Sequence, residues 1–228
     1  MKKLLFLIVS MISLSAFAQE TKVINDANAI TRTVSGSFTG ISVSSGIDLY
    51  LTQGNEESIA VSASEQKHFD RLITEVVNGT LKIYYENKGV TWKSSGKAKL
   101  KAYVSFKTLE KLYVCAGADV IVNGSIKADK LDMQVTSGAE FTGAINAKEL
   151  VAEVNSGAAM KVTGGADFKG YEFAVDYCDA KASSGGAVHI TINKELVAKA
   201  SSGGDIHYKG TGLISDIHTS SGGSVKKS

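Results

Sequence analysis

A short Ser-Gly segment recurs along the second half of this chain and constrains its fold more than any other feature. The clearest copies span 183–190, 201–208 and 220–227, and looser copies surround three earlier glycines. The central glycines are therefore separated by steps of 21, 19, 28, 18 and 19 residues: Gly117, Gly138, Gly157, Gly185, Gly203 and Gly222. A period of about 20 residues is typical of stacked supersecondary units.

Alignment of the copies on the central glycine, taken as position zero, shows period-two alternation on both sides. Positions −5, −3, +3 and +5 are mostly apolar, whereas positions −4 and +4 are mostly polar. The +3 position, for example, is Val120, Phe141, Met160, Val188, Ile206 and Val225. Each copy is thus predicted to be a strand, a tight corner and a second strand, with glycine at the corner because it tolerates positive φ. Such a unit is one coil of a parallel β-helix.

The start of the chain has the pattern of an export signal, with Lys2 and Lys3 before an apolar run and Ala16-Phe17-Ala18 as a small-residue cleavage site. We expect residues 1–18 to be removed. The rest is interpreted as a lead-in at 19–33, an irregular N-terminal β region at 34–108 and repeated coils at 109–228. No later run is apolar enough to predict a membrane span.

The N-terminal β region opens with a unit that fits the same template, with Gly46 at position zero and Ile41, Val43, Leu49 and Leu51 at the inward positions. Strands are expected at 58–63 and 99–106. Between them we expect a short helix at 65–73 capped by Ser64, and a hairpin around Asn78-Gly79.

Composition and charge narrow the function classes. The chain has 23 glycines, no proline, a 7% aromatic share and a formal charge of +2, and loss of Lys2 and Lys3 would bring the charge to zero. A strongly basic nucleic-acid surface is therefore not expected. Two cysteines are too few for a disulfide scaffold.

The signal-like start, the opening unit with its Ser44-Ser45-Gly46-Ile47-Asp48 segment, the 78–83 hairpin and the reiterated Ser-Gly corners together resemble the head GIN domain family of exported Bacteroidetes-type proteins, described as autotransporter adhesins. The resemblance covers roughly residues 33–226. It implies an all-β, right-handed parallel β-helix, and no catalytic motif or cofactor. The last three corners depart from it by having Gly-Gly in place of Gly-Ala.

His189 and His207 both fall at +4, with Asp205 at +2 on the same outward side, so the two imidazoles are expected to stack on adjacent coils. Two imidazoles and a carboxylate resemble part of a zinc site, but a structural site needs four ligands. We therefore expect a polar face without metal and keep both histidines as binding candidates.

An enzyme of the polysaccharide lyase or hydrolase type would need clustered carboxylates. The outward acids, however, are spread about one per coil: Asp119, Glu140, Glu153 and Asp205. Two further acids, Asp176 and Asp179, lie in the irregular long coil. No nucleophile motif accompanies the Ser-Gly corners. We expect no catalytic activity.

Trp92 is the third binding candidate, because a loop aromatic can stack on a sugar or anchor an interface. It can equally cover the open end of the stack, and the sequence does not separate the two. The corner serines form columns that serve either as a polar ridge or simply as turn residues whose hydroxyls bond locally.

Cys115 falls near a corner and Cys178 at −7 among buried leucines, about three coils away, so we expect two free thiols. The last coil would expose its edge, with Lys226 and Lys227 restraining association there. The sequence thus predicts an exported cell-envelope binding or adhesion module, periplasmic or at the surface. Its partner would be a cell-surface glycan or protein, with homo-oligomers through an open coil end. A carbohydrate-active enzyme and a purely structural envelope protein remain as alternatives.

Overall fold

The computed structural model describes residues 26–87, 98–163 and 175–228. These residues form a 16-stranded sheet and one 3₁₀ helix, which confirms the all-β prediction. The elements in chain order are β1 (Ile30–Arg32), β2 (Gly40–Val43), β3 (Ile47–Gln53), β4 (Ser58–Ala63), η1 (Gln66–Arg71), β5 (Leu72–Val77), β6 (Thr80–Tyr85), β7 (Leu100–Phe106), β8 (Lys111–Val114), β9 (Asp119–Val135), β10 (Glu140–Val154), β11 (Ala159–Thr163), β12 (Val175–Ala182), β13 (Ala187–Ala200), β14 (Asp205–Gly210), β15 (Leu213–Thr219) and β16 (Ser224–Lys227).

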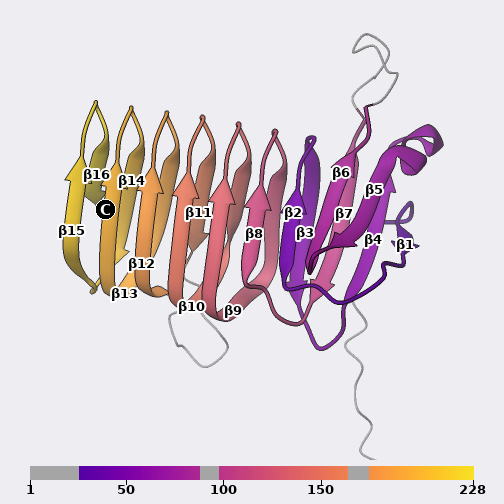
Figure 1. Cartoon of the computed structure of the whole chain (residues 1–228), viewed down its shortest axis with the longest axis horizontal. Helices are drawn as coiled ribbons and strands as arrows, with labels where there is room; N and C mark the ends of the chain where they lie inside the picture. The colour runs from indigo at the N-terminus through magenta and orange to yellow at the C-terminus, as the bar shows by residue number, and fades with distance from the viewer. Residues whose placement is uncertain (1–25, 88–97, 164–174) are drawn as a thin grey trace, which may run out of the picture.

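Successive repeats pair in parallel and in the register that the sequence alignment predicts. On one side of the corners the strands run in the order β3, β9, β10, β11, β13, β14, β16, and on the other in the order β2, β8, β9, β10, β12, β13, β15. The long strands β9, β10 and β13 contribute their two halves to different runs. Equivalent residues therefore lie side by side in columns, and the corner tips line up along one edge (Figure 1).

Each corner is a two-residue turn in which both central residues have positive φ. Ser137 has φ 58° and Gly138 has φ 68°, and the other corners have similar values. Two consecutive positive φ angles define the type I′ turn, which joins strands tightly. The corners also bond to one another, since the Gly138 N–H donates to the Ser156 carbonyl at 3.1 Å and the same bond recurs from Gly46 to Gly203. The predicted need for glycine is confirmed, and the residue before it, a serine at every corner except Ala116, also has a positive φ.

The core lies between the two runs of strands. All +3 residues from Val120 to Ile206 are at most 1% exposed, as are the −3 residues from Val114 to Ala200. Cys178 is buried between Leu150 and Leu196, its neighbours in register, which confirms its predicted column. The inward columns stop being buried in the last repeat, where Ile217 is 47% exposed. Among the described residues, β15 pairs only with β13, so one side of Ile217 has no neighbouring strand.

The opening unit belongs to the parallel stack. Its corner residues Ser45 and Gly46 both have φ 66°, and Ile41 and Leu49 lie beside Leu112 and Val120 of the next repeat. After β3 the chain forms an excursion that comprises β4, η1, β5, β6 and β7. In it, β6 and β7 pair in parallel with β2 and β3 and so extend the stack beyond the opening unit. β4 pairs antiparallel with β7, and β5 forms with β6 the predicted hairpin at Asn78-Gly79. This excursion lies at the end of the stack opposite β15 (Figure 1).

The helix predicted at 65–73 differs from the observed helix in type and in length. The structure has the 3₁₀ helix η1 at 66–71, and Leu72 and Ile73 already belong to β5. Ser64 does not cap it: the cap position is Glu65, which makes no side-chain capping bond, and the Ser64 hydroxyl accepts a bond from the Lys99 N–H at 3.4 Å. The pairing of β5 with β6 outweighs the helical spacing of Phe69, Leu72 and Ile73.

Candidate binding face

The outward side chains of the run from β7 to β16 form one long, regular face, which we call the outer face. It comprises the +2 and +4 columns of the repeats and their counterparts in β3 and β7. Its C-terminal half carries four basic side chains in unbroken register, here called the basic column: Lys161, His189, His207 and Lys226. The neighbouring +2 column in these strands holds a single carboxylate, Asp205.

The two histidines that the sequence singled out do stack. Their ring centroids are 4.9 Å apart and their planes differ by 11°. Nitrogen lone pairs lie in the ring plane, so parallel stacked rings do not converge on one ion. Among the described residues no group of three or more histidine, cysteine or acidic side chains is placed to hold a metal. The geometry therefore favours contact with a ligand surface over chelation.

The pKa of His189 is lowered. Partial burial of the ring is the largest cause, followed by the nearby His207 and Lys161, while Asp205 acts in the opposite direction. All of these neighbours lie on the outer face, one rung from His189. Parallel pairing thus brings together groups whose charges repel, and His189 becomes charged at a lower pH than a free imidazole does.

The N-terminal half of the outer face has a different character. Tyr50 and Tyr103 stack with centroids 5.1 Å apart and planes 15° apart, and Ile121, the next residue in their column, is 42% exposed. The Tyr103 hydroxyl donates to Asp26 at 2.8 Å, which lowers the pKa of Asp26. The pKa of Tyr103 is raised, first by burial and then by that bond.

Beside these tyrosines, Asp48, Asp119 and Glu140 occupy three adjacent rungs of the +2 column. The pKa of Asp119 is raised by burial and then by the two flanking carboxylates. The outer face is therefore aromatic and acidic at one end and basic at the other. Sequence analysis noted Asp119 and Glu140 but missed Asp48, because it lies 71 residues before Asp119 in the chain.

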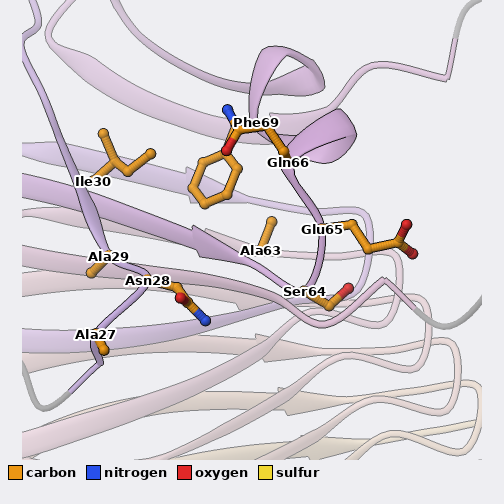
Figure 2. Close-up of a pocket in the computed structure, with 9 residues that line it drawn as sticks. All are labelled: Ala27, Asn28, Ala29, Ile30, Ala63, Ser64, Glu65, Gln66 and Phe69. Atoms are coloured by element: carbon orange, nitrogen blue, oxygen red, sulfur yellow. The ribbon is translucent and has the colours of Figure 1, made fainter.

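Two cavities of the described residues lie away from these carboxylates. One, of about 320 Å³, lies between 27–30 and 63–69 beside η1 (Figure 2). The other, of about 420 Å³, lies on the side away from the corners, between Gln53 and Asp176. In the second, Gln53 is fully engaged with the backbone of Lys107 and Lys127. The second cavity is lined by two carboxylates, Asp129 and Asp176, which form ion pairs with Lys148 and Lys194.

The corner serines do not form a continuous ladder of hydroxyls. One side-chain bond links adjacent corners, from the Thr136 hydroxyl to Asn155, whereas the bonds Thr136–Ser137 and Ser44–Ser45 lie within one corner. The backbone links the corners regularly, through the glycine N–H groups. This favours the turn interpretation of the serine columns. Trp92, the third candidate, lies outside the described residues, as do the proposed signal segment and most of the insertion in the 28-residue repeat.

Residues 37–212 match the family described as "putative auto-transporter adhesin, head GIN domain". The chain belongs to this family. Among solved structures, it resembles an adhesin candidate from Bacteroides fragilis with a TM-score of 0.66 and 16% identity, covering 89% of this chain and 98% of that one. A second from Parabacteroides merdae has a TM-score of 0.54 and 14% identity, covering 89% and 97%.

A third structure, from Parabacteroides distasonis, is described as a lipid-binding protein candidate and has a TM-score of 0.54, 21% identity and coverage of 89% and 98%. At these identities the likeness concerns the fold alone. No curated protein matches the chain. Within the described residues, no helix combines the length and apolarity needed to cross a bilayer.

Proposed function

We propose that this protein is an exported, non-catalytic binding module of the bacterial envelope, and that its basic column binds acidic groups of a cell-surface glycan. The family described as adhesins supports export and a binding role. We further infer that the parallel stack is a right-handed β-helix, the usual hand of parallel connections. Such a rigid stack holds side chains at a fixed spacing along a face.

The observation that carries the proposal is the unbroken register of Lys161, His189, His207 and Lys226 across four strands. A rung spacing of about 4.8 Å places the four basic side chains in a line. A linear anionic polymer can meet several of them at once, so weak contacts add through multivalency.

A glycan-array and titration experiment tests the proposal. The mature protein is expected to bind polysaccharides that carry carboxylate or sulfate groups, more strongly at low salt and at pH 5.5 than at pH 7.5, because His189 gains charge as the pH falls. Lys161→Gln and His207→Gln are expected to weaken binding. Lys199→Gln, an exposed lysine on the opposite side of the stack, is the matched control, and Trp92→Ala tests the loop.

Loss of binding in the Lys199→Gln control to the same extent would contradict a role for this face. Binding of no glycan at all would favour the structural alternative. Export is tested separately: N-terminal sequencing of protein from the envelope fraction is expected to begin at Gln19.

One observation favours a carbohydrate-active enzyme as a second candidate. Asp48, Asp119 and Glu140 stand in adjacent rungs, and a raised pKa at Asp119 is what a general acid needs. Incubation with polysaccharides and measurement of new reducing ends tests this function. Activity that is lost in Asp119→Asn would establish it, whereas unchanged polysaccharides would leave the binding proposal as the better account.

A further inference from the structure

The basic column places basic side chains at a fixed distance along the outer face. Its four members follow one another on adjacent rungs without a gap: Lys161, His189, His207 and Lys226. The two imidazole rings measure the spacing, since their centroids are 4.9 Å apart, and their planes differ by only 11°. Because adjacent rungs turn so little against each other, the column is nearly straight and offers one basic group for every rung.

The positions beside the basic column leave room for a chain that lies along it. On one side, the +2 column of the same strands carries three small side chains and one acid: Ala159, Ala187, Ser224 and Asp205. On the other side, at position +6, Thr191 lies next to the exposed Lys209 in register. Asp205 therefore repels an anion from the +2 side, whereas Lys209 attracts it to the +6 side. A polyanion is favoured over positions +4 and +6.

We propose that the ligand of this face is a linear polyuronate, a polysaccharide with a carboxylate on every sugar, which lies across the strands with one sugar over each rung. The inference rests on the proposed function, because it takes the basic column as the glycan site. In an extended 1,4-linked chain, each pyranose ring advances the polymer by close to the rung spacing. Every carboxylate then has a basic side chain of its own, and the weak contacts add along the column.

A polysaccharide with a carboxylate on every second sugar fits this face less well. Its charges are separated by about two rungs, roughly 10 Å, so every second basic side chain has no carboxylate opposite it. An equal number of carboxylates also extends over twice the length of the face. Beyond Lys161 the column continues with Thr142 and Ile121, which carry no charge, so carboxylates that reach these rungs gain no ion pair.

Calorimetric titration with two ligands of equal charge tests the spacing. Tetragalacturonate carries four carboxylates on four sugars, and the hyaluronan octasaccharide carries four on eight. At pH 5.5 and low salt, we expect the mature protein to bind tetragalacturonate about fivefold more tightly, a difference of the size that one exposed ion pair contributes. Equal affinities, or tighter binding of hyaluronan, would overturn the polyuronate inference and leave the proposed function standing. Binding of no anionic polysaccharide at all would instead contradict the proposed function itself.

A double variant separates the alignment of the charges from their number. Ala187→His/His189→Ala moves one imidazole to the +2 position of the same rung, about 7 Å along the strand, and keeps the composition of the face. We expect it to weaken tetragalacturonate binding about fivefold and to change hyaluronan binding little, because only the polyuronate needs a basic group on every rung. Full retention of the preference for tetragalacturonate in this variant would overturn the proposal.

Two further variants check the position of the ligand. Asp205→Asn is expected to tighten tetragalacturonate binding, since it removes the acid beside the column, and weaker binding would show that the ligand lies elsewhere. Lys199→Gln, in the other run of strands, is the matched control and is expected to leave both affinities unchanged. All the replaced side chains point outward, and an unchanged thermal midpoint of each variant verifies that it folds.

Discussion

At the scale of single residues, a glycine in the core makes room for the side chains around it. Phe141 is fully buried among aliphatic neighbours. Two residues later Gly143 occupies an inward position, where a Cβ would lie 2.4 Å from Cγ2 of Val122 and 3.2 Å from Cζ of Phe141. The glycine therefore leaves the volume that the phenylalanine ring and the valine fill, and the narrow core accepts one large aromatic side chain.

Phe141→Ala is expected to lower the free energy of unfolding by about 3–5 kcal/mol, because it removes a buried ring and leaves a cavity. Chemical denaturation measures the change. Tyr113→Ala is the control: Tyr113 is 38% exposed, and a surface substitution usually changes stability by about 0.5 kcal/mol or less. An equally small effect at Phe141 would show that the inward register is wrong.

His189 offers a residue-scale test of the column. His207→Gln is expected to raise the pKa of His189, because it removes a repelling charge from the adjacent ring. An NMR pH titration of the imidazole resonances measures this pKa, and His218→Gln, in the other run of strands, is the control. A pKa of His189 that stays unchanged in His207→Gln would contradict the stacking.

The lowered pKa of His189 also predicts how the stability of the folded protein changes with pH. The unfolded chain binds this proton first as the pH falls, so the folded protein loses stability as the pH drops below about 6.5. In His207→Gln this loss is expected to be smaller. Thermal unfolding of both proteins across pH 5–8 measures it.

At the scale of the repeating element, the corners fall into two classes. At Gly186, Gly204 and Gly223 the N–H bonds the carbonyl three residues earlier at 2.8 Å, whereas at Ala118, Ala139 and Ala158 the bond is 3.2–3.3 Å. A Cβ at Gly204 would lie 2.3 Å from the carbonyl oxygen of Ala182. The Gly-Gly departure from the family pattern thus reflects tighter corners in the last three repeats.

Gly204→Ala is therefore expected to destabilise the protein by about 1–3 kcal/mol, since the added methyl group meets backbone and cannot be accommodated by a side-chain rotation. The reciprocal change Ala139→Gly, at the equivalent position of a wider corner, is expected to cost about 0.5–1 kcal/mol through backbone entropy. Urea denaturation of both variants compares them. A smaller effect for Gly204→Ala than for Ala139→Gly would contradict the distinction between the two classes.

At the scale of the whole molecule, the parallel stack decides which distant residues meet. The opening unit lies between the excursion and the repeats, so β2 has β6 on one side and β8 on the other. The same stacking keeps residues apart: Cys115 follows β8, and Cys178 lies in β12, three rungs further along its run. Both are free thiols in the structure.

This separation predicts the reactivity of the thiols. Cys178 is buried and its pKa is raised by that burial, whereas Cys115 is half-buried beside a corner. A thiol reagent is expected to modify Cys115 in the native protein and Cys178 only after denaturation. Two thiols should be titrated under denaturing, non-reducing conditions. A mass two hydrogens low, with no thiol found, would mean that the cysteines are bridged and the stacking is misplaced.

The sequence by itself determined the features that depend on local periodicity. Alternation of period two assigned the inward columns, and the spacing of Ser-Gly corners assigned the repeats and the stacking of His189 on His207, because a strand's covalent geometry fixes which side chains share a side. Tertiary structure alone decided what depends on pairing across long stretches of chain. It placed Asp48 beside Asp119, and Tyr50 against Tyr103. It placed Leu72 and Ile73 in β5 and not in a longer helix. It also covered one end of the stack and left Ile217 exposed at the other. Each of these depends on which strand becomes a neighbour, a choice made by burial of the whole core and not by any local pattern.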